Sequence, residues 1–389
     1  MIPRSLEGKI AQLADKFPVI SVTGPRQSGK TTLIKSIFSG YKYTSLEEPD
    51  IRLIAGSDPR RFLESGTRMI IDEIQRVPEL FSYIQSYTDD SKINGQFIIS
   101  GSQSFLLNQH ISQSLAGRVA IFNLLPFSIS ELSDHGIRIN SYENLIYTGF
   151  YPRLYDQNIN PEDFFPNYIQ TCIERDIRLL QNVHNLSLFV RFLKLCAGRT
   201  GQMLNLNSLA NDCGISVNTA KSWISVLETS FIIFLLQPHF RNFNKRVVKT
   251  PKLYFYDTGL ASSLLEIRSE AQLKTHYLRG ALFENLILAE LLKERYNKGL
   301  RNNCYFWRDN KGVEIDCIID TGEKLIPVEI KSADTFDKDF FRNLKYWNNL
   351  SGNPSDNAYL IYGGNNSADT KDGKLVSWKD IQSLGLSDH

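Results

Sequence analysis

The chain has 389 residues, of which 42% are hydrophobic and 22% are charged, an ordinary composition for a globular protein. This length exceeds what one hydrophobic core normally supports, so we expect two or three domains. The formal net charge of +2 neither demands nor excludes a nucleic-acid partner. Only local basic patches can indicate such a partner.

Cysteine usage and apolar runs indicate the compartment. The five cysteines show no C-x-x-C spacing, which argues against a zinc site or a disulfide framework and favours buried thiols in a reducing compartment. The N-terminus lacks an apolar leader, and the longest apolar run, residues 231–236, is far too short to span a bilayer. We therefore expect a soluble, cytoplasmic protein without a membrane partner.

Residues 24–31 fit the phosphate-loop pattern G-x-x-x-x-G-K-[ST] without a gap. A buried strand is predicted before the loop (18–23) and a helix after it (32–38), which is the context that the motif requires. Backbone amides and the helix N-terminus would bind phosphate, the lysine would reach the β- and γ-phosphates, and Thr31 would complete a Mg²⁺ shell. The predicted nucleotide contacts are Gly24, Pro25, Arg26, Gln27, Ser28, Gly29, Lys30, Thr31 and Thr32.

An apolar strand over residues 68–74 ends in Asp72 and Glu73. At this distance beyond a phosphate loop, the first acid is expected to hold Mg²⁺ and the second to orient the attacking water. The structural alternative is an acidic pair that caps a helix.

Two further polar residues are weaker candidates for the same site. Ser102 follows the predicted strand 97–100 and is a candidate γ-phosphate sensor, with a simple turn residue as the alternative. Arg118 is a candidate arginine finger or sensor that acts in cis or in trans, with a structural ion pair as the alternative. The alternation of strands and helices predicts an open parallel α/β sheet covered on both faces for residues 1–150.

The middle region, residues 151–275, is predicted to be helical and then winged-helix. Residues 207–212, a turn at Gly214 and a helix over 217–229 capped by Ser216 form a helix–turn–helix pattern. Two strands follow (232–236 and 253–256), and their connection carries Arg241, Lys245, Arg246 and Lys249. Such a region contacts DNA through the helix and the basic wing, or else serves as a lid or a protein contact.

The C-terminal region, residues 276–389, contains three acids and a lysine on a predicted helix and two predicted strands. Glu284 lies on an apolar helix, Asp316 on one strand, and Glu329 and Lys331 on the next strand, where alternate residues share a face. This pattern resembles PD-(D/E)xK nucleases, in which carboxylates hold Mg²⁺ and lysine activates water. Glu314-Ile315-Asp316 replaces a literal Pro-Asp pair. A fold kept only as a binding platform is the alternative.

Eleven segments occur in an order that resembles a large family of bacterial and archaeal AAA-like ATPases. They are GPRQSGKTTL, YTSLEEPD, RMIIDEIQRVPEL, FIISGSQ, SLAGRV, LPFSISEL, GFYPRLY, YIQTCIERDI, YFYDTGL, GALFENLI and VEIKSA. The resemblance implies an α/β multidomain chain with an AAA-like P-loop sheet, a helical and winged-helix region, and an α/β restriction-endonuclease-like end. It also implies ATP as the nucleotide.

Two functions follow from these patterns. The first is an ATPase that uses ATP and Mg²⁺ and controls a Mg²⁺-dependent nuclease acting on DNA or RNA. The second is a nucleotide-gated protein that binds nucleic acid or protein through a catalytically silent nuclease-like fold. An oligomer is compatible with either.

Overall fold

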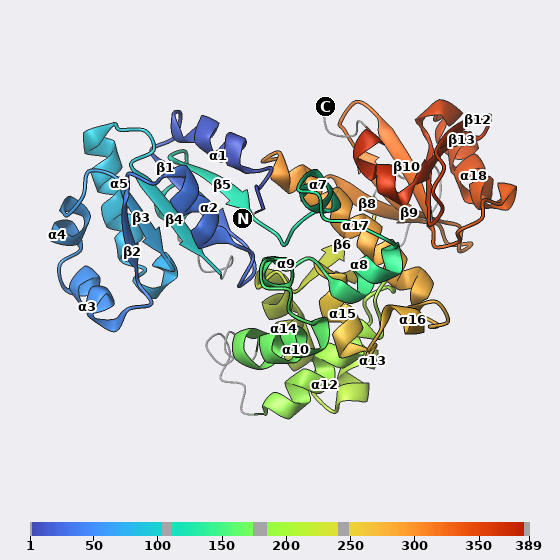
Figure 1. Ribbon diagram of the computed structural model, residues 1–389, viewed down its shortest axis with the longest axis horizontal. Coiled ribbons are helices and arrows are strands. Elements are labelled where there is room, and N and C mark those ends of the chain that lie inside the picture. Colours follow the sequence, from blue (N-terminus) through green and yellow to red (C-terminus); the bar gives the residue numbers. More distant parts are fainter. Residues whose placement is uncertain (1, 103–110, 112, 174–184, 240–248, 385–389) are drawn as a thin grey trace. The chain divides into compact units, whose positions relative to one another are not determined.

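The computed structural model describes residues 2–102, 111, 113–173, 185–239 and 249–384, and the chain forms two compact units (Figure 1). The first unit comprises residues 1–127, 229–231 and 296–300, and the second unit comprises the remainder. Residues 128–150 thus group with the second unit, and the middle and C-terminal regions share one unit. The division into three domains at residues 150 and 275 stays a prediction.

The first unit contains a five-stranded parallel sheet in the order β2-β3-β4-β1-β5. Its strands are β1 (Val19–Thr23), β2 (Lys42–Ser45), β3 (Met69–Asp72), β4 (Phe97–Gly101) and β5 (Val119–Asn123). β4 lies between the strand that precedes the phosphate loop and the strand that carries the acidic pair. Ser102, which directly follows β4, therefore lies between these two groups at the carboxyl edge.

Helices cover both faces of this sheet, as the sequence predicted. The first unit contains α1 (Glu7–Ala14), α2 (Lys30–Ile37), α3 (Pro49–Ser57), α4 (Pro59–Glu64) and α5 (Leu80–Ser91). Ile20, Ile70 and Ile98 pack with α1 and α2 on one face, whereas their neighbours Val19 and Met69 pack with α3, α4 and α5 on the other. Adjacent strand residues point to opposite faces, so an apolar run buries both of them.

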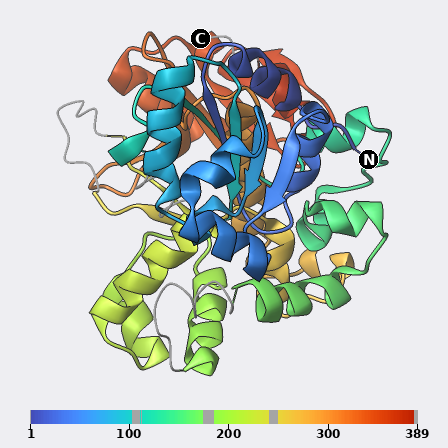
Figure 2. The same cartoon turned by 90° about the vertical axis from the view of Figure 1, so that its left-hand side faces the viewer.

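The second unit begins with a helical region, drawn in green to yellow in Figures 1 and 2. It contains α7 (Ile129–Asp134), α8 (Tyr142–Thr148), α9 (Pro152–Asp156), α10 (Pro161–Tyr168), a π-helical turn (Ile169–Ile173), α12 (Leu186–Ala197), α13 (Leu206–Cys213) and α14 (Val217–Thr229). The antiparallel strands β6 (Ile233–Leu236) and β7 (Lys252–Phe255) follow, and then α15 (Thr258–Leu264) and α16 (Glu270–Leu273). α15 packs against α8, α10 and α12.

The remainder of the second unit is a mixed six-stranded sheet in the order β12-β13-β11-β10-β9-β8, preceded by α17 (Arg279–Asn297). Its strands are β8 (Cys304–Arg308), β9 (Glu314–Asp320), β10 (Leu325–Lys331), β11 (Tyr359–Tyr362), β12 (Ala368–Thr370) and β13 (Gly373–Ser377). β9 pairs antiparallel with β10, and β10 pairs parallel with β11. α18 (Arg342–Ser351) packs on one face through Leu344 and Trp347.

Throughout the described residues, no helix is both long and apolar enough to cross a membrane.

Candidate functional site

The phosphate loop connects β1 to α2 and has the backbone conformation that its glycines permit. Gly24 has φ +150° and Gly29 has φ +92°, and Gln27 also has a positive φ of 61°. A Cβ atom on Gly24 would lie 2.1 Å from the carbonyl oxygen of Leu124, the residue that follows β5. Only glycine therefore fits at this position unless the backbone at Leu124 moves. The loop is thus shaped by packing against the end of the neighbouring strand.

Lys30 is buried at the first turn of α2 and is held inside the loop. Its Nζ donates to the carbonyl oxygens of Gly24 (2.9 Å) and Pro25 (2.8 Å). The Ser28 hydroxyl is buried and makes no hydrogen bond to any described residue. A phosphate group would offer acceptors to both side chains, so these residues fit a nucleotide at the helix N-terminus.

Arg4 supports this loop and was not identified from the sequence. Its guanidinium donates to the carbonyl oxygens of Ser28 (2.8 Å) and Leu125 (2.7 Å). Arg4 precedes α1, far from the loop in sequence, and no local pattern indicates its partner.

Of the other predicted nucleotide contacts, Arg26 lies 3.8 Å from Glu47, and Thr32 lies in the first turn of α2.

Asp72 accepts hydrogen bonds from three different elements at the carboxyl edge of the sheet. Its Oδ2 accepts from the hydroxyls of Thr31 (2.8 Å) and Tyr43 (3.0 Å), and its Oδ1 accepts from the Ser100 hydroxyl (2.5 Å). Burial, followed by the Asp72 charge, raises the pKa of Tyr43 and keeps its proton on the donor. The Thr31 hydroxyl and the Asp72 carboxylate are suitable oxygen ligands for Mg²⁺.

Glu73 has φ +54° and ψ +43°, a left-handed conformation that is uncommon for glutamate. Its Oε2 accepts from Ser102 Oγ (3.3 Å) and from the Gln75 amide. Uncommon backbone conformations cost free energy and persist only where the surrounding structure holds them. They occur preferentially at functional sites. The hydrogen bond from Ser102 places it beside Glu73 at the carboxyl edge of the sheet. The sequence predicted a role for each of these residues separately.

Arg118 does not join this group. It immediately precedes β5, and the parallel register places Val119 opposite Val19, at the end of β1 away from the phosphate loop. β1 has five residues, or roughly 16 Å of strand. Arg118 instead pairs with Asp89 (2.6 Å), which is the structural ion pair named as the alternative, and this position does not favour a finger in cis. A role in trans stays a prediction.

A second polar group, here called the carboxylate cluster, consists of Glu284, Glu314, Asp316 and Glu329 in the second unit. Asp316 and Glu329 lie on the paired strands β9 and β10. Lys331 Nζ is 2.6 Å from Glu329 Oε1 and 3.7 Å from Asp316 Oδ2. Glu329 and Lys331 thus share a face of β10, as the alternation predicted, and lie beside Asp316 of β9; their role as nuclease residues stays a prediction.

Glu284, a fourth member of the predicted site, forms its ion pair with a different cation. Lys252, from β7, is 3.1 Å from Glu284 Oε1 and also contacts Glu314 Oε1. Tyr254 donates to the same Glu284 oxygen from the same face of β7. Sequence analysis missed Lys252, Tyr254 and Glu314, although the alternate spacing of Lys252 and Tyr254 on a strand was a usable signal.

Burial disfavours the ionised form of two members of the cluster, Glu284 and Glu329. Burial raises the pKa of Glu284 to about 7, with Lys252 opposing the shift. Burial and then the Asp316 charge raise the pKa of Glu329 to about 8, with Lys331 opposing. Glu329 Oε2 is buried and accepts no hydrogen bond from any described residue.

A metal ion fits this cluster only in part. Asp316 and Glu329 present suitable oxygens, and the unpartnered Glu329 Oε2 is an open ligand position. Among the described residues, however, no three His, Cys, Asp or Glu side chains are arranged to hold a metal ion. The predicted metal ligand Glu284 is held by Lys252 instead.

The predicted helix–turn–helix is present as α13 and α14. Gly214 has φ +76°, and Ser216 Oγ accepts from the Thr219 amide (3.1 Å), as its capping role requires. Asn218 and Lys221 are exposed on α14. Of the predicted basic wing, Lys249 is exposed, whereas Arg241, Lys245 and Arg246 lie outside the described residues.

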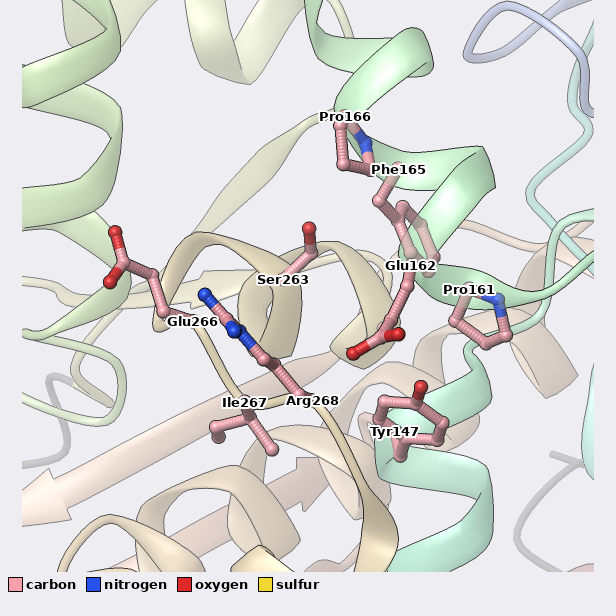
Figure 3. A pocket seen from close by; sticks show the side chains of 10 residues that line it. Tyr147, Pro161, Glu162, Phe165, Pro166, Ser263, Glu266, Ile267 and Arg268 are labelled. Carbon is pink, nitrogen blue, oxygen red and sulfur yellow. The ribbon is translucent and has the colours of Figure 1, made fainter.

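A separate pocket of about 390 Å³ opens in the helical region of the second unit (Figure 3). Phe165 and Ile267 line its apolar part, and the charged side chains of Glu162, Glu266 and Arg268 also line it. Glu266 pairs with Lys194 (2.6 Å). The pocket contains none of the predicted site residues.

Comparison with known families assigns a class to the first of these regions. Residues 16–133 match the model of an AAA domain. Residues 139–271 match a domain of unknown function (DUF8612), and residues 279–381 match another (DUF4143).

Two relatives found by sequence are described as uncharacterized proteins. The uncharacterized protein Rv2008c of Mycobacterium tuberculosis is 28% identical over 336 residues, covering 85% of this chain and 74% of that protein. An uncharacterized protein of Haemophilus influenzae is 22% identical over 357 residues, covering 83% and 84%. Among solved structures, the Walker-type ATPase PABY2304 of Pyrococcus abyssi is 15% identical with a TM-score of 0.43, covering 68% of this chain and 96% of that one.

The AAA-domain match, the parallel sheet and the phosphate loop together support an AAA-like P-loop ATPase domain. The other two matched domains have no assigned function. The winged-helix and nuclease-like interpretations therefore stay predictions.

Proposed function

We propose that this protein binds ATP with Mg²⁺ at residues 24–32, hydrolyses it, and uses the nucleotide state to control the carboxylate cluster. The observation that carries the ATPase proposal is the 2.8 Å contact between Thr31 Oγ1 and Asp72 Oδ2. It joins the residue after the phosphate-loop lysine to the acid at the end of β3. These are the two side chains that an ATP-bound Mg²⁺ requires.

The chain's residues divide the work of hydrolysis. Lys30 would exchange its two carbonyl partners for the β- and γ-phosphates, where its charge offsets that of the transition state. Thr31 and Asp72 would hold Mg²⁺, which neutralises phosphate charge when it is bound. Glu73 would orient the attacking water, and Ser102, hydrogen-bonded to Glu73, would report the γ-phosphate.

Phosphate release with ATP and Mg²⁺ tests this assignment. Lys30→Ala should abolish nucleotide binding. Glu73→Gln should retain binding and lose roughly 10²–10⁴-fold in hydrolysis rate. Glu64→Gln, which removes an exposed carboxylate of the same unit, is the matched control and should hydrolyse ATP normally. Hydrolysis by Glu73→Gln at the wild-type rate would show that Glu73 does not position the water.

The carboxylate cluster suggests a second activity, Mg²⁺-dependent cleavage of nucleic acid. The observation that favours it is the buried, unpartnered Glu329 Oε2 beside Lys331. Asp316 and Glu329 would hold the metal ion, which polarises a phosphodiester when it is bound. Lys331 would orient the attacking water and offset developing charge. Exposed Asn218 and Lys221 on α14, together with the basic connection after β6, would contact the DNA or RNA.

Labelled single- and double-stranded DNA and RNA, with Mg²⁺ or Mn²⁺ and with or without ATP, provide the test. Lys331→Ala should lose cleavage while keeping ATP hydrolysis. Lys30→Ala should lose the ATP dependence of cleavage.

The alternative is a nucleotide-gated binding protein with a silent nuclease-like fold. The engagement of Glu284 and Glu314 by Lys252 favours it. It predicts ATP-sensitive retardation of nucleic acid with no cleavage in either metal.

A further inference from the structure

We propose that Lys252 and a divalent cation are alternative occupants of the carboxylate cluster. In this arrangement Lys252 must leave before a third carboxylate can join Asp316 and Glu329 around a metal ion. The inference rests on the second activity proposed above, and it adds a regulating residue from the two-stranded β6–β7 sheet.

The first observation is the burial and pairing of Lys252. The residue is 3% exposed, and its ammonium contacts one oxygen of Glu284 and one oxygen of Glu314. Lysine is seldom buried to this degree unless opposite charges surround it. Tyr254 donates to the same Glu284 oxygen, so that oxygen already has two donors.

The second observation is an unpartnered carboxylate oxygen in the other half of the cluster, where Lys331 and Asn343 contact only Glu329 Oε1. Glu329 is 1% exposed, and its Oε2 has no hydrogen-bond partner in the described part of the chain. Asp316 Oδ2 accepts from the Ile330 amide (2.8 Å) and lies 3.7 Å from Lys331 Nζ. Glu329 Oε2 is thus available to a cation beside Asp316, whereas the other two carboxylates, Glu284 and Glu314, are paired with Lys252.

Charge makes the two occupants exclusive. Three cations face the four carboxylates: Lys252, Lys331, and Arg308, whose guanidinium contacts Glu314 Oε2 (3.2 Å). A divalent ion that approached Glu284 would meet the Lys252 ammonium in a poorly solvated space, where like charges repel strongly. Withdrawal of Lys252 would remove this repulsion and release a third carboxylate at once.

We expect the Lys252 side chain to move while strand β7 keeps its position. The Lys252 backbone lies opposite Leu236 of β6 and forms a bridge with Met203 on its other side. The lysine side chain is flexible, so its ammonium can move while β7 stays in place.

Mn²⁺ binding to the full-length chain, measured by calorimetry without nucleotide, tests the inference. Lys252→Met should bind Mn²⁺ at least about tenfold more tightly than wild type. Lys252→Arg should keep the weak wild-type binding. Adding Glu329→Gln to Lys252→Met should remove the gain. Lys293→Met is the matched control, because Lys293 is equally buried and pairs with Glu290 (2.7 Å) outside the cluster.

A second measurement needs no variant at position 252. Amine acylation of the wild-type protein, followed by mass spectrometry, should leave Lys252 unlabelled without metal and labelled with saturating Mn²⁺. Lys293 should stay unlabelled in both conditions. Equal Mn²⁺ affinities of wild type and Lys252→Met, or Mn²⁺ binding without labelling of Lys252, would overturn the competition while leaving the metal site intact. Absence of Mn²⁺ binding from every variant would overturn the metal site as well, and would leave the ATPase proposal untouched.

Discussion

Replacement of Gly24 by alanine tests whether the nucleotide site depends on close packing between the phosphate loop and the end of β5. The added Cβ would lie 2.1 Å from the carbonyl oxygen and 3.0 Å from the carbonyl carbon of Leu124. Both are backbone atoms, and the Leu124 amide donates to the Thr23 carbonyl (2.7 Å). The clash therefore cannot be relieved by rotating a side chain.

Two costs add in this variant. Gly24 has φ +150°, a region in which a side chain costs roughly 1–3 kcal/mol. The steric overlap forces a backbone shift that costs about another 1–3 kcal/mol. We expect Gly24→Ala to lower the free energy of unfolding of the first unit by about 2–6 kcal/mol, and to weaken ATP binding at least about tenfold because the loop moves.

Urea unfolding with and without ATP measures both effects. Because the chain has two compact units, the relevant transition is the one whose midpoint ATP raises in the wild type. Gly8→Ala is the matched control, since a Cβ there meets nothing within 4 Å and Gly8 lies inside α1. That control should be neutral or stabilise by up to about 1 kcal/mol. If Gly24→Ala unfolded at the wild-type urea concentration and bound ATP with the wild-type affinity, the expected clash with the Leu124 backbone would be refuted.

Two further predictions concern the carboxylate cluster and Arg118. The pKa values of Glu284 (about 7) and Glu329 (about 8) exceed the ordinary value of 4.5, so the folded protein retains protons that the unfolded chain releases. The free energy of unfolding should therefore fall as the pH rises from about 4.5 to 8. Glu329→Gln should make this fall smaller, as measured by urea midpoints near pH 6 and pH 8.5. An equally steep fall in the variant would contradict the raised pKa of Glu329. Arg118→Ala should hydrolyse ATP within about twofold of the wild-type rate, whereas loss of an arginine finger would cost roughly 10³-fold or more. A loss of that size in phosphate release would place Arg118 of a second copy at the nucleotide.

The sequence by itself was enough to predict the phosphate loop because its parts are local. Gly24, Gly29, Lys30 and Thr31 lie within eight residues, and a strand–loop–helix connection fixes how they converge on a phosphate. Asp72 and Glu73 end an apolar strand, and strands that run parallel bring their carboxyl ends to one edge. Asp316, Glu329 and Lys331 were likewise predictable from alternation on neighbouring strands.

Only the tertiary structure decided which distant residues share a site. Arg118 resembled a finger in sequence, but strand direction places it at the opposite edge of the sheet from the phosphate loop. Lys252 follows the basic connection by three residues in the sequence, yet it is buried and pairs with Glu284 and Glu314. Their pairing depends on how β7, α17 and β9 pack together, and no local periodicity encodes such long-range contacts.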